Sequence, residues 1–193
     1  MVVWHAGFAL AAVAPGPRVG MFLGSTIAEG GALMTTMEQL GPDLRAFLTM
    51  YKWMRIDPVP WAVLGKPLSE SRIGLVVNAC MTMPDQSPFD AEQPDNDPSI
   101  RIVPSDTDPR VLVNTYPGQG FDHAGLQADP NLLIPLDRLR EMIGSSELGE
   151  LGPRVVSLCG HITKPKVLIA ETAPEIARMF VEDGIDVALL VPA

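Results

Sequence analysis

The chain has 193 residues, enough for one domain with a substantial core. It has 14 Lys and Arg residues and 23 Asp and Glu residues, which give a net charge of −9, and it contains no basic run. This charge distribution argues against a surface that binds nucleic acid or an anionic membrane. The 19 prolines and 17 glycines cluster between apolar segments and indicate a loop-rich protein rather than a helical bundle.

An apolar run from Val2 to Ala14 opens the chain. It spans about 13 residues, against the roughly 20 that cross a bilayer, and it lacks the basic start of a secretory signal. It is either a disordered extension or the result of a start codon assigned too far upstream. The second interpretation is favoured because organised sequence begins near Met34 or Met37. We therefore expect an extension over residues 1–36 and one domain over residues 37–193.

The middle of the chain predicts few regular elements. Apolar residues at helical spacing predict an amphipathic helix from Glu38 to Met54 on the outside of the domain. A continuous apolar run from Arg72 to Ala79 is typical of a parallel strand covered on both faces. Residues 83–109 read as a long acidic loop with one short strand at 100–103. Another short strand is expected within 108–115, and residues 116–128 read as loop.

The last third of the chain alternates helices and strands. Helices are expected at 136–143 and 171–183, the second with Pro174 in its first turn and Gly184 as its stop. Strands are expected at 154–158 and 185–191. This order predicts a parallel βαβ crossover and an α/β fold: an open, mostly parallel sheet with helices on both faces in Rossmann-like layers, incomplete at its C-terminal end.

Cys80 and Cys159 are the two cysteines. They are too few for a disulfide scaffold and lack metal-ligand spacing, so we expect reduced thiols, a cytoplasmic protein and no metal site. The acidic loop could offer oxygen ligands to calcium or magnesium, but it lacks EF-hand spacing, and a solvated or cleft-organising loop is favoured. Its carboxylates are Asp85, Asp90, Asp95, Asp97, Asp106 and Asp108.

Nine segments, in this order, resemble the selenoprotein B family of glycine, sarcosine, betaine and D-proline reductases. The resemblance covers roughly residues 51 to 193. The segments are Lys66-Pro-Leu-Ser-Glu-Ser-Arg-Ile73, Pro84-Asp-Gln-Ser-Pro-Phe-Asp90, Asp97-Pro-Ser-Ile-Arg101, Pro104-Ser-Asp-Thr107, Phe121-Asp-His-Ala-Gly125, Asp129-Pro-Asn131, Pro135-Leu-Asp-Arg-Leu-Arg140, Glu171-Thr-Ala-Pro-Glu-Ile-Ala-Arg178 and Asp183-Gly-Ile-Asp-Val-Ala-Leu-Leu-Val-Pro192.

In that family the strand resembling Val187 to Pro192 is followed by selenocysteine or cysteine. The resemblance therefore implies a selenocysteine immediately after Ala193. Selenocysteine is encoded by UGA, and the chain is expected to be truncated because this codon was read as a stop. A selenol is ionised at neutral pH, whereas a free thiol has a pKa of about 8.5. The implied cycle is attack by this nucleophile, closure of a selenenyl-sulfide and reduction by a dithiol. The downstream gene sequence tests it: a UAA or UAG with no further family-like frame contradicts the hypothesis.

Candidate site residues come from the strand ends and from the family-like segments. The Asp122-His123 pair is a candidate general acid, with a turn that caps backbone amides as the alternative. Arg138 is a candidate for binding a substrate carboxylate, against a structural salt bridge. Cys80 and Cys159 each end a predicted strand and could exchange with the redox residue, although buried inert cysteines are commoner.

The resemblance implies an oxidoreductase subunit that reductively cleaves a C–N or related bond. Its substrate is expected to be a small amine or amino-acid derivative, its electron donor a thioredoxin-like dithiol, and its partner another reductase subunit or a second copy of the chain. No nucleic acid or membrane is expected to bind. The alternatives are a non-catalytic binding or scaffold module of the same fold, and a cysteine-based enzyme that uses Cys80 or Cys159.

Overall fold

The computed structural model describes residues 3–5, 9–11, 37–50, 62–90, 92, 97–115, 123–160, 162 and 164–192. The chain forms two compact units, Pro15–Val59 and the remainder, Met1–Ala14 with Pro60–Ala193. The smaller unit holds a 3₁₀ turn η1 (Met37–Gln39) and the helix α1 (Pro42–Met50). The helix begins later than the predicted start at Glu38, and residues 51–54 of that prediction lie outside the described residues. In the larger unit, β1 (Val3–His5) and β2 (Ala9–Ala11) pair antiparallel.

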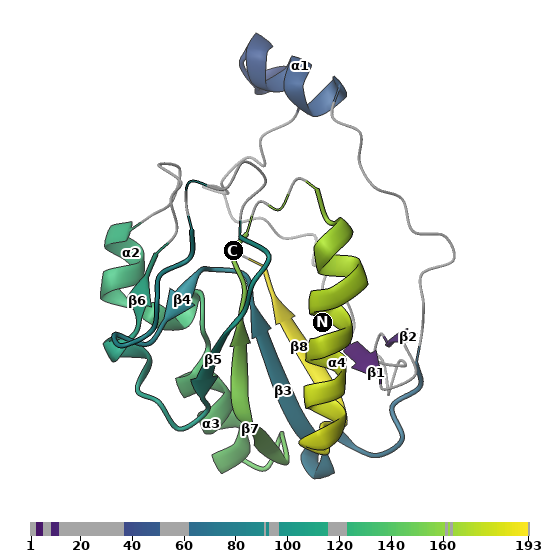
Figure 1. The fold of residues 1–193 in the computed structure, drawn as a ribbon. Coiled ribbons are helices and arrows are strands. Elements are labelled where there is room, and N and C mark those ends of the chain that lie inside the picture. Colours follow the sequence, from purple (N-terminus) through teal and green to yellow (C-terminus); the bar gives the residue numbers. More distant parts are fainter. Residues whose placement is uncertain are drawn as a thin grey trace, which may run out of the picture. The chain divides into compact units, whose positions relative to one another are not determined.

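A four-stranded sheet forms the centre of the larger unit, in the order β5-β7-β3-β8 (Figure 1). The central strand β3 (Arg72–Val77) runs parallel to β7 (Glu150–Ser157) and to β8 (Val187–Val191). The edge strand β5 (Arg101–Pro104) runs antiparallel to β7. The predicted open, mostly parallel sheet is confirmed. Val77 is level with Ser157 on one side and with Val191 on the other, so the three parallel strands end at one edge.

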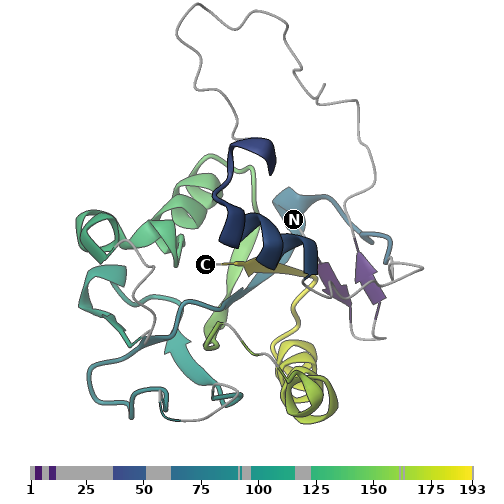
Figure 2. The same cartoon turned by 90° about the horizontal axis from the view of Figure 1, so that it is seen from above.

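Helices cover both faces of the sheet (Figure 2). The helix α3 (Leu136–Gly144) packs Leu136 and Leu139 on the face that carries Val77 and Val155. The helix α4 (Ala173–Glu182), preceded by the π-helical turn η5 (Leu168–Thr172), packs on the opposite face, against Val76 and Val156. Side chains alternate between the faces because a strand has a period of two residues.

Shorter elements surround the sheet. The strand β4 (Met81–Thr82), which follows β3 in the chain, pairs antiparallel with β6 (Val113–Asn114). The 3₁₀ turns are η2 (Leu68–Glu70), η3 (Pro109–Val111) and η4 (Pro130–Leu132). The helix α2 (His123–Ala128) contradicts the prediction of loop through residue 128. This helix has about one and a half turns and contains a glycine, so its local helix propensity is low. Burial of Leu126 in the core stabilises the helix.

Gly149 joins α3 to β7 where another backbone passes at contact distance. Its N–H donates to the carbonyl of Leu68 at 2.9 Å, and a Cβ on Gly149 would lie 2.5 Å from the carbonyl oxygen of Ser71. The atoms that a Cβ would meet belong to the backbone, so they cannot move aside as a flexible side chain could. We expect Gly149→Ala to lower the free energy of unfolding by about 2–3 kcal/mol.

Urea unfolding followed by circular dichroism measures this loss. Gly144→Ala is the matched control, since a Cβ at Gly144 meets nothing within 4 Å. That variant should be neutral or slightly more stable, because alanine is the better helix former. Equal stabilities for the two variants would contradict the packing at Gly149.

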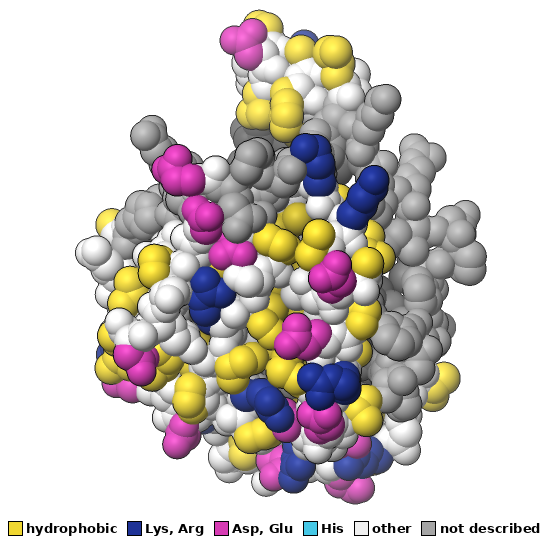
Figure 3. Space-filling model, in the orientation of Figure 1, with side chains coloured by type: hydrophobic (Ala, Val, Ile, Leu, Met, Phe, Trp, Pro, Cys, Tyr) yellow, Lys and Arg dark blue, Asp and Glu magenta, His cyan; other side chains and the backbone are white. Residues whose placement is uncertain are grey.

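The face shown in Figure 3 mixes acidic, basic and apolar side chains without an extended region of one charge sign. Within the described part of the chain, no helix is long and apolar enough to span a bilayer.

Candidate functional site

The topology opens a crevice at the carboxyl edge of the sheet. The chain between β3 and β7 places α3 on one face, and the chain between β7 and β8 places α4 on the other. The segments that leave the adjacent strands β3 and β7 therefore diverge to opposite faces. Open α/β sheets bind ligands at such a switch point, outside the carboxyl ends of the strands.

A disulfide between Cys80 and Cys159 spans this switch point, with the two Cα atoms 4.4 Å apart. The prediction of reduced thiols is therefore wrong in this structure. Cys80 lies three residues beyond β3 and Cys159 two residues beyond β7, so parallel pairing of these strands brings the cysteines together. The bond joins the segments that follow the two strands.

Backbone hydrogen bonds hold the two cysteines independently of the sulfur bond. The N–H of Cys80 donates to the carbonyl of Leu158 at 2.8 Å, and the carbonyl of Cys80 accepts from the N–H and the hydroxyl of Thr115, both at 3.0 Å. Asn114 Nδ2 donates to the carbonyl of Ala79 at 2.7 Å. Cys80 has a φ of +52°, in the left-handed region that non-glycine residues rarely adopt. Its hydrogen bonds fix this conformation.

The acidic loop covers the disulfide on one side. Phe89 forms one buried cluster with the two cysteines, and the Arg101 guanidinium lies 4.4 Å from the centroid of the Phe89 ring. Arg101 also donates to the carbonyls of Ser87 and Pro88, at 2.8 and 2.9 Å. Asp85, Asp90, Asp106 and Asp108 are solvent-exposed, as expected of a solvated loop, and Asp95 lies outside the described residues. Asp97 is buried and orders the loop rather than facing water.

Asp97 accepts hydrogen bonds from the N–H groups of Asp90 and Ser99 and pairs with Arg101 at 3.6 Å. Burial acts to raise the pKa of Asp97, but the hydrogen bonds from Ser99 and Asp90 and the charge of Arg101 outweigh it and leave that pKa below its ordinary value. A folded-state pKa below the unfolded one stabilises the fold above the unfolded pKa. The contribution is lost as pH falls through the folded pKa.

We therefore expect Asp97→Asn to lower the free energy of unfolding at pH 7 more than at pH 3, because the wild type has lost part of the carboxylate contribution at the lower pH. Urea unfolding at the two pH values measures the difference. Asp85→Asn, an exposed carboxylate in the same loop, is the control and should lower stability little at either pH. An equal loss at pH 7 and pH 3 for Asp97→Asn would count against the ordering role of this carboxylate.

A cavity of about 550 Å³ lies on the α4 side of the carboxyl edge. Its wall is mostly apolar and is formed by the ends of β3 and β8, by α4 and by the segment after β7. Cys159 lines it, together with Gly160 and Asn78, and so does Pro192 at the end of β8. The volume is that of a pocket for a small organic ligand.

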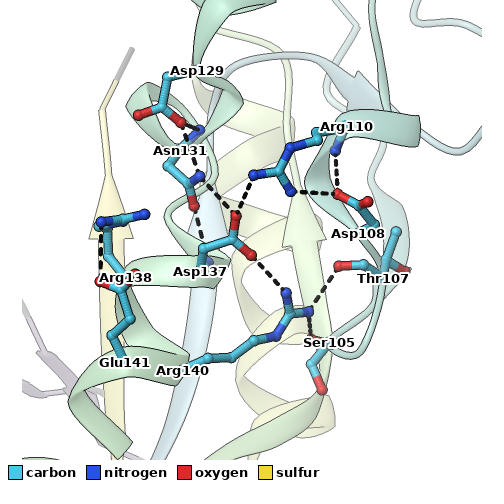
Figure 4. Close-up of polar contacts among 10 residues, drawn as sticks. All are labelled: Ser105, Thr107, Asp108, Arg110, Asp129, Asn131, Asp137, Arg138, Arg140 and Glu141. Carbon is cyan, nitrogen blue, oxygen red and sulfur yellow. Dashed lines mark hydrogen bonds and ion pairs between the residues drawn. The ribbon is translucent and has the colours of Figure 1, made fainter. Parts of the chain in front are cut away.

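The remaining predicted site residues are Asp122, His123 and Arg138. Asp122 is outside the described residues, and His123 begins α2 without a described side chain, so the expected general acid stays a prediction. Arg138 is exposed on α3 and pairs with Glu141 at 3.0 Å (Figure 4). This is the structural alternative named for it. Among the described residues, no group of three His, Cys, Asp or Glu side chains could hold a metal ion.

Asp137, also in the family-like segment of α3, organises a polar network on the α3 face (Figure 4). Its N–H donates to Asn131 Oδ1 at 2.9 Å, and its carboxylate accepts from Asn131 at 3.1 Å and Arg140 at 3.0 Å. Arg140 also donates to the carbonyls of Ser105 and Thr107, each at 2.8 Å. The pKa of Asp137 lies below its ordinary value, mainly because its carboxylate accepts a hydrogen bond from Asn131. Burial acts to raise this pKa, whereas Arg110 and Arg140 lower it further. The network fixes the turns on this face.

The site thus combines an open α/β sheet, a disulfide and a ligand-sized cavity at one edge. The family model for glycine/sarcosine/betaine reductase selenoprotein B matches residues 16–193, and the chain belongs to this family. The match begins earlier in the chain than residue 51, where the resemblance was placed from the sequence. The family assignment made from the sequence is confirmed.

Among curated proteins, the chain is 28% identical over 139 residues to D-proline reductase subunit gamma of Acetoanaerobium sticklandii. The alignment covers 72% of this chain and 55% of that protein, so the chain spans little more than half the length of this relative. No solved structure matches the chain.

Proposed function

We propose that this chain is a subunit of a selenocysteine- or thiol-dependent reductase of the glycine, betaine, sarcosine and D-proline reductase type. It takes part in the reductive cleavage of a C–N or related bond in a small amine or amino-acid-derived substrate. The observation that carries the proposal is the cavity at the carboxyl edge, which shares Cys159 with a disulfide and lies where α/β sheets bind ligands. Family membership supplies the reaction class.

The proposed electron donor is a thioredoxin-like dithiol, and the proposed setting is a cytoplasmic complex with another reductase subunit. The selenol or thiol that the family resemblance implies belongs to this proposal. Pro192 lines the cavity at the end of β8, so a nucleophile carried there reaches a bound substrate. A chalcogenolate attacks an electrophilic carbon, and the C–N bond breaks with the amine leaving as it takes up a proton. A thiol then attacks the selenium or sulfur, the carbon leaves and takes up a proton, and the dithiol donor reduces the selenenyl-sulfide or disulfide that results.

The test uses the full-length gene product purified together with its partner subunits. Glycine, sarcosine, betaine and D-proline are each supplied with a dithiol, and substrate loss and dithiol oxidation are followed by mass spectrometry. We expect one substrate to be consumed with one dithiol oxidised per bond cleaved, and selenium to be detected in the protein. No coupled dithiol oxidation with any of these substrates would overturn the proposal.

One observation favours the alternative of a non-catalytic binding or scaffold module. Both sulfur atoms of the disulfide are buried and are held by hydrogen bonds of their neighbours, as in a structural cross-link. On this alternative the complex turns over at the same rate when Cys80 and Cys159 are both replaced by alanine and when the cavity is filled.

A further inference from the structure

The two sulfur atoms of the disulfide face different surroundings. Cys80 has no exposed surface; it lies in one buried cluster with Phe89, and Thr115 holds its carbonyl. Cys159 is 4% exposed and forms part of the cavity wall. Cys80 is not among the residues that line the cavity, so a reagent that enters the cavity approaches the disulfide from the side of Cys159.

We propose that Cys80 and Cys159 form a redox-active dithiol/disulfide pair that an external dithiol reduces through the apolar cavity, by attack on Cys159. This function goes beyond the proposed cleavage reaction and needs neither its substrate nor its partner subunit. Two cysteines alone do not make a scaffold, and in a reducing compartment a disulfide is usually transient and catalytic or redox-sensing.

The chemistry balances in two exchanges. A thiolate of the external dithiol attacks the sulfur of Cys159, the bond between the two cysteines breaks, and Cys80 leaves as a thiolate that takes up a proton. The second thiolate of the reagent then attacks its own sulfur in the mixed disulfide and releases Cys159. Two electrons and two protons pass from the dithiol, which becomes a cyclic disulfide, to the protein.

The surrounding backbone makes the pair reversible. The hydrogen bonds from Cys80 N–H to Leu158 and from Thr115 to the carbonyl of Cys80 do not involve sulfur, so they persist after reduction. They keep the two Cα atoms at the separation that a disulfide requires. The reduced pair can therefore close again without a search through other conformations.

The segment that follows Cys159 couples this chemistry to the cavity. Gly160 and Ile162 line the cavity directly after the cysteine. Opening the bond removes the covalent link between this wall and the segment that follows β3, while the hydrogen bonds of Cys80 persist.

The first test follows reduction of the native full-length protein by dithiothreitol, with thiols trapped by iodoacetamide and assigned by peptide mass spectrometry. Ala177 lines the cavity from α4, whereas Val181 lies on the exposed side of the same helix. We expect Ala177→Phe to slow reduction about tenfold and Val181→Phe to change it by less than about twofold. Circular dichroism checks that each variant is folded.

The second test compares single thiols. Cys80→Ala leaves the thiol of Cys159, and Cys159→Ala leaves that of Cys80; the reagent is 5,5′-dithiobis(2-nitrobenzoate). We expect Cys159 to react about 100-fold faster, since reaction at Cys80 requires local unfolding. Equal reactivity of the two thiols, or a wild-type disulfide that dithiothreitol reduces only in denaturant, would overturn the proposal. Neither readout includes turnover, so a failed reductase assay leaves this result intact.

Discussion

Replacing Cys80 and Cys159 together by alanine is expected to lower the free energy of unfolding by about 4 kcal/mol. The two cysteines are 79 residues apart in sequence, so the bond closes a long loop and strongly restricts the unfolded chain. Guanidinium unfolding of the oxidised wild type against the double variant measures the loss.

The double variant is the informative one because a single replacement leaves a buried free thiol. Dithiothreitol-treated wild type is the companion sample and should lose a similar amount of stability. A domain with an ordinary 5–15 kcal/mol of stability remains folded after such a loss, as the redox proposal requires. A difference below about 1 kcal/mol would show that the bond contributes little in the folded protein.

Phe180→Ala is expected to lower the free energy of unfolding by about 4 kcal/mol. The ring is 6% exposed and belongs to the core between α4 and the sheet. It fits there because Gly74 of β3 has no side chain; a Cβ on Gly74 would lie 2.8 Å from the ring. Removing the ring leaves a void that the neighbouring backbones cannot close.

Val181→Ala is the matched control, since the next residue of the same helix is 52% exposed. The two replacements introduce the same residue into the same helix, so their difference isolates burial. We expect the control to stay within about 0.5 kcal/mol of the wild type. If Phe180→Ala were equally mild, α4 would not pack on the sheet as described.

The sheet could be predicted because its strands are continuous apolar runs. The runs at 72–79 and 185–191 contain β3 and β8, the run at 154–158 contains the second half of β7, and the helix stop at Gly184 lies where α4 ends. α2 could not be predicted in the same way. It is too short to show helical periodicity, and the burial of Leu126 is a tertiary effect.

The site was less accessible to sequence analysis. That Cys80 and Cys159 each end a strand is visible in the sequence, but their pairing depends on β3 and β7 being neighbours, which the sequence does not state. The covering role of Phe89 and the anchoring role of Thr115 also depend on contacts between distant segments. Arg138 illustrates the converse, because its segment is family-like while its side chain faces solvent.

The central claim is that substrate reacts in the cavity at the carboxyl edge of β3, β7 and β8. The most direct measurement is the turnover of the complete reductase carrying Ala177→Phe or Val181→Phe, with the folded state of each confirmed. We predict that filling the cavity lowers kcat/KM by about 100-fold and that the exposed control stays within about twofold of the wild type. Full turnover by Ala177→Phe would place the reaction elsewhere and contradict the account.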